Sequence, residues 1–125
     1  MRKELQEFFK VDWEDPEEAL KWYMAGWKNL EYALKWFKAG WPDPEIAMEW
    51  HKAGWRKPYF TFKWLKTGWK DPVLAMIWHN VGWNNPKVAY EYFSSGFEDP
   101  RYAYYLYYSK GLKPEDIKKK LKDEL

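Results

Sequence analysis

Apolar and polar positions recur along this chain with a period of fourteen residues. The stretch "WEDPEEALKWYMAGW", residues 13–27, begins and ends on tryptophan, and "WKNLEYALKWFKAGW" and "WPDPEIAMEWHKAGW" follow at once. Seven units each begin at an aromatic residue: Trp13, Trp27, Trp41, Trp55, Trp69, Trp83 and Phe97. Self-similarity at a fixed period indicates a tandem array of small structural units that stack on one another.

Each unit carries the start and stop features of one short helix. Asp or Asn at position 3 is a preferred N-cap, and proline at position 4 suits the first helical residue. Glycine at position 14 favours the left-handed conformation that ends a helix, and the aromatic residue after it folds back onto the last turn. We therefore expect one helix of about ten residues per unit, which is marginal unless it packs against neighbours.

The apolar positions 6, 7, 8, 10, 11 and 13 cover more than half of the circumference of such a helix. An arc that wide requires neighbours on more than one side, as inside a solenoid. The structural core of the repeat is predicted at position 10, which holds Trp22, Trp36, Trp50, Trp64 and Trp78. Positions 5, 9 and 12 are the regularly polar ones and are expected to face outward.

A second period of twenty-eight residues separates odd units from even units. Position 3 is Asp in every odd unit, and Asn or Lys in the even ones. The odd units carry ten acidic and five basic residues, whereas the even units carry two acidic and eight basic residues. This alternation predicts helical hairpins with an acidic layer of odd helices and a basic layer of even helices.

The predicted fold is an all-α solenoid of short helices, with the fourteen-residue units paired into twenty-eight-residue helical hairpins. We expect a single domain over 1–125, made of an N-terminal capping helix (1–12), seven repeats (13–110) and a C-terminal capping helix (111–125). Polar terminal units that depart from the repeat are what a solenoid needs for solubility.

Composition supports a core without covalent staples. The chain has eleven Trp, ten Tyr, seven Phe and no Cys, which excludes disulfides and thiolate metal sites. The net charge of +2 does not indicate a nucleic-acid binder. There is no apolar run of membrane-spanning length and no signal-peptide pattern, so we expect a cytoplasmic protein without membrane contact. The final "LKDEL" is interpreted as a charged helix end, because a retention tail requires an entry signal.

No constellation of side chains meets the geometric roles of catalysis, so we expect no enzyme and no cofactor. The Asp series is explained by capping, and the three serines lie at helix ends. His51 and His79 share position 11 of odd units and could share a metal ion, although such a site needs more ligands. We favour partly buried histidines bonded to backbone groups or tyrosine hydroxyls.

Two outward surfaces are candidate interaction sites. The interaction patch on the odd helices consists of Val73, Ile77, Tyr105 and Tyr108, unless the C-terminal helix folds over it. The basic stripe on the even helices consists of Lys35, Lys38, Lys63 and Lys66. It could follow a phosphate backbone, or it could simply be a solvated helix face.

The pattern A-x-x-W-x-x-A-G-[WF]-x-D-P-x-x-A, as in "ALKWYMAGWKNLEYA" and "AMEWHKAGWRKPYF", resembles short Trp/Gly helical tandem repeats of bacterial proteins. The resemblance covers residues 13–111. It implies tandem short helices and brings no activity or functional residue with it. The run "YAYYLYYSKG" departs from the pattern, because Leu106 occupies position 10 and the glycine comes one residue late, at Gly111.

These features predict a non-enzymatic structural or interaction protein, either a scaffold or a self-assembling subunit of an oligomer or filament. Its partner is then another protein or a second copy of the chain. Three alternatives stay open: nucleic-acid backbone binding through the basic stripe, an adaptor for foreign peptides, and a designed repeat protein without biological function.

Overall fold

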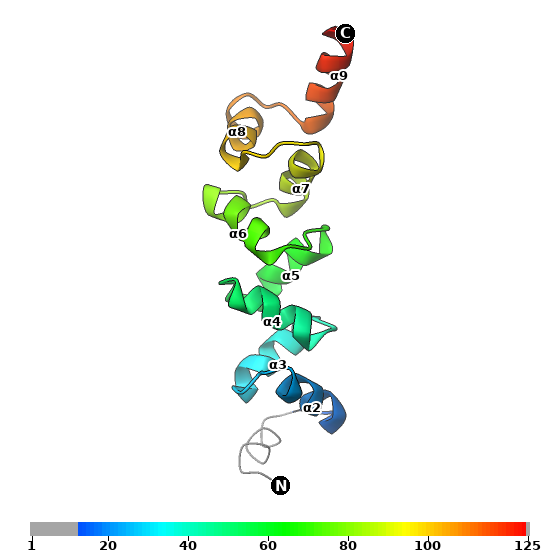
Figure 1. The fold of residues 1–125 in the computed structure, drawn as a ribbon, viewed down its shortest axis with the longest axis vertical. Helices are drawn as coiled ribbons and strands as arrows, with labels where there is room; N and C mark the ends of the chain where they lie inside the picture. The colour runs from blue at the N-terminus through cyan, green and yellow to red at the C-terminus, as the bar shows by residue number, and fades with distance from the viewer. Residues whose placement is uncertain (1–12, 125) are drawn as a thin grey trace. The chain divides into compact units, whose positions relative to one another are not determined.

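The computed structural model describes residues 13–124 and shows one short helix per repeat (Figure 1). The helices are α2 (Pro16–Met24), α3 (Leu30–Lys38), α4 (Pro44–Lys52), α5 (Pro58–Lys66), α6 (Pro72–Val81), α7 (Pro86–Ser94), α8 (Pro100–Tyr104) and α9 (Pro114–Glu124), and a π-helical segment, η1 (Tyr105–Ser109), continues α8. No strand occurs between residues 13 and 124. The predicted all-α solenoid of short helices is confirmed, while the capping helix predicted over 1–12 lies outside the described residues.

The chain divides into two compact units, 1–62 and 63–125, with the boundary inside α5. In the first unit α2 contacts α4, and in the second unit α6 contacts α8. Each of these pairs joins two odd helices, as expected if the odd helices form one layer. In the second unit α7 also contacts α8, which places an even helix against the odd pair. The expectation of a single domain stays a prediction.

Helix starts follow the capping chemistry that the sequence predicts. The carboxylate of Asp15 accepts a hydrogen bond of 2.9 Å from the backbone N–H of Glu17, which satisfies one of the free donors of the first turn. The same bond is made by the side chains of Asp43, Asp71, Asn85 and Asp99. These caps set the helix starts at the fourth position of their units.

Helix ends explain the paired tryptophans. The N–H of Trp27 donates to the carbonyl of Trp22 at 3.1 Å, and the N–H of Gly26 donates to the carbonyl of Tyr23 at 3.1 Å. This is the Schellman arrangement, which brings an apolar contact with it. The rings of Trp22 and Trp27 accordingly lie 5.4 Å apart between centroids. Trp27 therefore packs on Trp22 at the point where the helix ends.

The tryptophan at position 1 of a repeat also forms a hydrogen bond to the following repeat. Its indole Nε1–H donates to the carbonyl of the helix-starting proline seventeen residues ahead. The bonds are Trp27 to Pro44 (2.9 Å), Trp41 to Pro58 (3.1 Å), Trp69 to Pro86 (3.0 Å) and Trp83 to Pro100 (3.1 Å). Because these nitrogens are buried, each bond satisfies a donor that would otherwise be costly to remove from water.

Consecutive aromatic rings form an unbroken ladder through each of the two compact units. In the first unit it runs through Trp13, Trp22, Trp27, Trp36, Trp41, Trp50 and Trp55, with centroids 5.0 to 6.3 Å apart. In the second unit it runs through Trp64, Trp69, Trp78, Trp83, Tyr92 and Phe97, with centroids 5.1 to 5.7 Å apart. The five position-10 tryptophans are fully buried, so the core follows this ladder.

Gly68 and Thr61 occupy tightly packed or fully buried positions. Gly68 has φ +120°, and a Cβ built there would lie 3.0 Å from the ring of Tyr90. Glycine is therefore required both for the backbone conformation and for the contact. Thr61 replaces the usual alanine of position 7 and is fully buried. Its hydroxyl donates to the carbonyl of Lys57 at 2.6 Å, so no buried polar atom is left unsatisfied there.

Candidate interaction face

The predicted interaction patch lies on two helical segments that pack side by side in the second unit. Val73 and Ile77 are on α6 and are 58% and 49% exposed. Tyr105 and Tyr108 are on η1 and are 46% and 42% exposed. Since α6 contacts α8, and η1 continues α8, these side chains share one region of the unit. Their role in binding stays a prediction.

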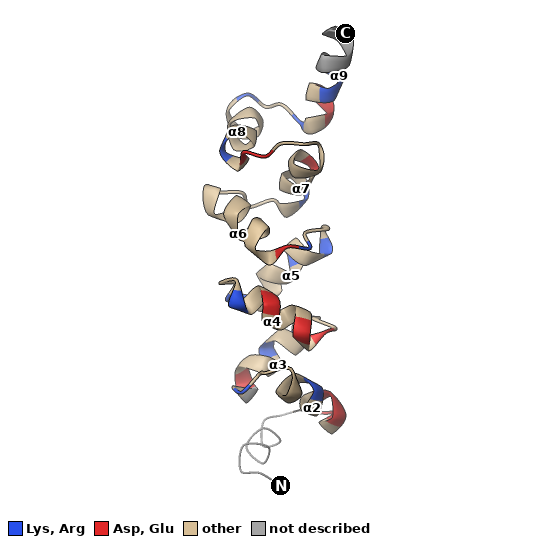
Figure 2. Cartoon of the chain, in the orientation of Figure 1, with Lys and Arg blue, Asp and Glu red and all other residues tan. Residues whose placement is uncertain are grey.

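The helical segments of this region carry little charge. The ten residues of α6, PVLAMIWHNV, include no Asp, Glu, Lys or Arg, and α6 is tan throughout in Figure 2. In α8 and η1 the single charged residue is Arg101. Tyr102, which the sequence analysis did not single out, adds another exposed ring at 55%. We call the surface formed by Val73, Ile77, Tyr102, Tyr105 and Tyr108 the apolar face.

The C-terminal helix leaves this face open. α9 begins at Pro114, which is buried, and the preceding Leu112 carbonyl accepts a hydrogen bond from the hydroxyl of Tyr92 on α7. With α9 so placed, the four side chains of the predicted patch keep the exposed fractions given above. The alternative in which the C-terminal helix folds over the patch is therefore wrong.

The π-helical segment accounts for the late glycine of the seventh unit. At the end of the sixth repeat's helix, the N–H of Phe97 donates to the carbonyl of Tyr92, five residues back. At the end of the seventh repeat's helix, the N–H of Leu112 donates to the carbonyl of Leu106, six residues back. One extra residue has thus been inserted, and η1 absorbs it by widening one turn. π-Bulges occur frequently at functional sites, and this one lies in the apolar face.

A cluster of rings around Trp83 holds η1 in place. Tyr104, Tyr107 and Tyr108 lie 5.7, 5.9 and 5.5 Å from the ring of Trp83. The Tyr104 and Tyr108 rings are 4.4 Å apart, and the Tyr108 hydroxyl donates to Oδ1 of Asn84 at 2.8 Å. Tyr108 is therefore held in place by ring packing and a hydrogen bond while 42% of it stays exposed. The run YAYYLYY contained this cluster, but spacing alone did not reveal its common centre.

The basic stripe falls in both units. Lys35 and Lys38 are exposed on α3 of the first unit, and Lys63 and Lys66 are exposed on the part of α5 that belongs to the second unit. The structure thus describes two lysine pairs, each on one helix. A continuous basic surface over all four stays a prediction.

The acidic character of the odd layer is concentrated in the first unit. Glu17, Glu18, Glu45 and Glu49 lie on α2 and α4, whereas α6 carries no acid at all (Figure 2). The outer faces of the two units are therefore chemically different, although they are built from the same repeat. The charge difference between odd and even repeats, which was counted over the whole chain, does not hold among the repeats of the second compact unit.

Each histidine sits among aromatic rings. The His51 ring lies 5.4 Å from Trp27, 5.1 Å from Tyr32 and 6.0 Å from Trp36. Burial, together with the positive charge of Arg56, lowers the pKa of His51. His79 lies in the other unit, 5.7 Å from Trp64. Between residues 13 and 124 no three His, Asp or Glu side chains come together as a metal site would require.

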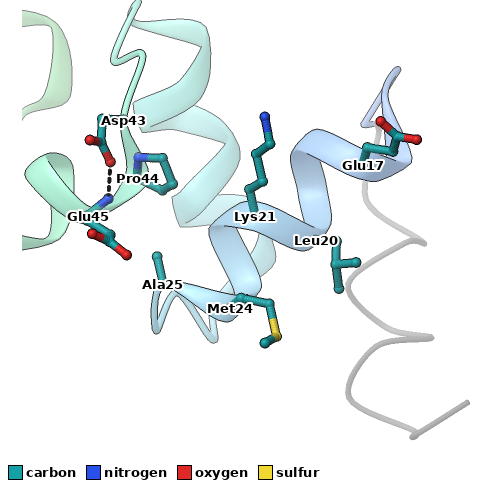
Figure 3. Close-up of a pocket in the computed structure, with 8 residues that line it drawn as sticks. All are labelled: Glu17, Leu20, Lys21, Met24, Ala25, Asp43, Pro44 and Glu45. Atoms are coloured by element: carbon teal, nitrogen blue, oxygen red, sulfur yellow. Dashed lines mark hydrogen bonds between the residues drawn. The ribbon is translucent and has the colours of Figure 1, made fainter.

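A hollow of about 570 Å³ lies between α2 and the first turn of α4 (Figure 3). Leu20, Met24, Ala25 and Pro44 form its apolar part, and Glu17, Lys21, Asp43 and Glu45 form its charged part. Asp43 is already engaged in capping α4 (Figure 3). Met24 stands 75% exposed at its edge, so the hollow is an open surface depression rather than an enclosed ligand site.

Comparison with protein-family models, curated proteins and solved structures finds no match for this chain. The resemblance to bacterial Trp/Gly repeats therefore stays a prediction. No helix in the described part of the chain combines the length and apolar character needed to cross a membrane.

Proposed function

We propose that this protein is a non-enzymatic helical-repeat scaffold that self-associates through the apolar face of its second unit. The observation that carries the proposal is the exposure of two aliphatic and three tyrosine side chains on α6 and on the α8–η1 segment. Exposed apolar patches rimmed by polar residues mark interaction surfaces more often than isolated apolar residues do.

The chemistry of the face fits a second copy of the same chain. Across a two-fold axis the same surface meets itself, so any charge on it is brought near its own copy. The helical segments that form the apolar face carry only Arg101 as a charged residue, and Lys110 lies at the edge of the face with its Nζ 5.7 Å from the Tyr105 ring centroid, so little charge meets its own copy. The corresponding surface of the first compact unit carries both acids and bases on α2 and α4, including Lys21 and Lys52, and burying these charges against a second copy would be costly.

The composition of the face also matches the centre of a protein interface, where tyrosine is enriched and Lys and Glu are depleted. Five side chains make up only part of a standard interface, which buries roughly 800 Å² per partner. We therefore expect reversible association in about the micromolar range rather than an obligate dimer.

Sedimentation velocity over a range of concentrations tests the proposal. Larger species that persist at high salt are expected, because contacts between uncharged side chains are not screened. The double variant Ile77→Lys/Tyr105→Lys is expected to be monomeric. Met24→Lys is the matched control: it places a lysine on the outer surface of the first unit, at a position where Lys38, Lys52 and Lys66 occur in other units.

Three results would contradict the proposal. Wild-type protein that stays monomeric at all concentrations would show that the face does not bind its own copy. Association that survives the double lysine substitution would show that the interface lies elsewhere. Loss of association in the Met24→Lys control would point to the outer surface of the first unit instead.

A further inference from the structure

Four buried tryptophans of the second unit lead in even steps to one exposed tyrosine. The centroid distances along Trp64, Trp69, Trp78, Trp83 and Tyr108 are 5.5, 5.7, 5.7 and 5.5 Å. The four tryptophans are at most 1% exposed, whereas Tyr108 is 42% exposed. The ladder therefore connects the interior of the unit to solvent without a missing ring.

Such a row has the geometry of a path for single electrons. At these centroid distances neighbouring rings are in van der Waals contact. Electron tunnelling slows exponentially with the gap between donor and acceptor, so short steps between touching rings are fast. Trp and Tyr are the side chains best suited to one-electron steps in a chain without cysteine. A neutral tyrosine that loses its proton as it is oxidised is a somewhat better electron donor than tryptophan.

We propose that the tryptophan ladder of the second unit carries oxidising equivalents from its buried interior to Tyr108 at the surface. A diffusing oxygen-centred radical, such as the carbonate radical anion, takes one electron from a ladder tryptophan; it is itself reduced to carbonate, and the ring is left as a radical cation. Each oxidised ring then takes an electron from its neighbour, and this repeats until Trp83 is the oxidised ring. Tyr108 then gives one electron to Trp83 and its phenolic proton to water. The products are an intact ladder, one tyrosyl radical, one released proton and the oxidant reduced by one electron.

The indole hydrogen bonds favour onward transfer. Nε1–H of Trp69 donates to the Pro86 carbonyl, and that of Trp83 donates to the Pro100 carbonyl. A backbone carbonyl is too weak a base to remove the proton from an oxidised indole. The oxidised ring therefore stays a radical cation, which is a stronger oxidant than the neutral indole radical and draws an electron from the next ring more readily.

Tyr108 is the end of the path because its proton can leave. Tyr92 also lies 5.7 Å from Trp83, but it is fully buried and its hydroxyl donates to the Leu112 carbonyl. Burial raises the pKa of Tyr92 to about 12 and also raises the pKa of Tyr108, so the two differ in exposure: Tyr92 is fully buried, whereas Tyr108 is 42% exposed. The Tyr108 hydroxyl bonds to Asn84 near the surface, where water accepts the proton.

The activity goes beyond self-association and belongs to the monomer, because a second copy bound to the apolar face would cover Tyr108. A radical at the surface is reduced by a soluble donor such as ascorbate, which returns the tyrosine to its starting state. A radical left on a buried tryptophan would instead react with oxygen and damage the core. The ladder would thus protect the packing that holds the solenoid together.

Light-driven oxidation with radical trapping tests the path. The protein, diluted to its monomeric state, is excited at the red edge of tryptophan absorption, where tyrosine does not absorb. A cobalt(III) ammine complex takes up the released electron, and a nitroso spin trap captures tyrosyl radicals for peptide mass spectrometry. Wild-type protein is expected to carry the trap on Tyr108. Tyr102 is the internal control, because it is exposed but packs on Phe97 instead of a tryptophan.

Trp83→Phe breaks the path, because phenylalanine is far harder to oxidise. Phe97 shows that position 1 accepts this side chain. Trapping at Tyr108 is expected to fall to the level of the unilluminated sample. Unchanged trapping at Tyr108, or equal trapping at Tyr102, would mean direct oxidation from solvent and would overturn the proposal.

Tyr108→Phe provides a second measurement that does not depend on folding of the Trp83 variant. It keeps the ring against Trp83 and removes only the hydroxyl. The fast phase in the decay of tryptophan-radical absorption is expected to disappear, whereas Tyr102→Phe is expected to retain it. A decay in Tyr108→Phe identical to that of the wild type would also overturn the proposal.

Discussion

The indole N–H of Trp27 donates to the backbone carbonyl of Pro44, seventeen residues ahead, at 2.9 Å. The bond joins the first residue of one repeat to the first helical residue of the next. Trp41, Trp69 and Trp83 make the same bond. Each of these tryptophans therefore closes the helix before it by ring packing and positions the start of a later helix by a hydrogen bond.

Replacing Trp27 by phenylalanine separates these two roles. Trp36 is the matched control, because it is also buried and its Nε1 finds no hydrogen-bond partner among the described residues. Both substitutions replace an indole by a smaller phenyl ring, but only Trp27→Phe loses a hydrogen bond. We expect Trp27→Phe to lower the free energy of unfolding by about 1 kcal/mol more than Trp36→Phe. Urea titrations of the two variants measure the difference, and equal losses would show that the bond contributes nothing.

The glycines at position 14 all allow a positive φ, but only some of them are also needed for close packing, so their substitution is predicted to cost different amounts of stability. Gly68 and Gly96 both have positive φ, but a Cβ at Gly68 meets Tyr90 at 3.0 Å whereas one at Gly96 meets nothing within 4 Å. Gly96→Ala should cost about 1 kcal/mol or more from conformation alone. Gly68→Ala should cost more again, since Tyr90 must also move. The ranking is measured by thermal unfolding, and a lower melting temperature for Gly96→Ala than for Gly68→Ala would contradict it.

The extra residue of the seventh unit is predicted to be dispensable for folding. Deleting Ser109 places the glycine at position 14 again, so η1 should become an ordinary α-helical turn. The melting temperature is expected to stay the same or rise. Deleting Ser95 is the control, because the sixth unit has no spare residue and its glycine cap would move out of place. Circular dichroism during heating distinguishes the two, and equal destabilisation would mean that η1 is not an insertion.

His51 is predicted to make the protein less stable in mild acid. Burial, aided by the positive charge of Arg56, holds the pKa of the folded-state imidazole below its ordinary value of 6.5. The unfolded chain therefore binds a proton first, and stability falls as the pH drops below about 6.5. His51→Phe, which installs the residue found at the same position in Phe37 and Phe93, should flatten this decline. Urea titrations at several pH values measure it; an unchanged slope in the variant would exclude His51 as the cause.

Much of the fold could be predicted from the sequence because short-range chemistry specifies it. Asp15 caps its helix and Gly26 ends it through bonds to residues a few positions away, and the spacing of these residues displays those bonds directly. Alternation between odd and even units likewise predicted which helices contact each other. These relationships depend on local geometry and a constant period.

Contacts that leave the repeat were harder to predict. Nothing in the spacing showed that Trp27 would reach the carbonyl of Pro44, because any buried tryptophan satisfies the same apolar pattern. The late Gly111 was visible in the sequence, but its physical meaning required the hydrogen bond from Leu112 to Leu106. The direction taken by α9, which leaves Tyr108 exposed, depends on how η1 ends and not on periodicity.

A mixing experiment tests most directly whether the apolar face binds its own copy. The variants Ile77→Lys/Tyr105→Lys and Ile77→Glu/Tyr105→Glu are each expected to be monomeric, because like charges then meet across the interface. An equimolar mixture at low salt is expected to sediment as a heterodimer that dissociates at high salt. Monomers in the mixture, or association of either variant alone, would contradict self-association through α6 and η1.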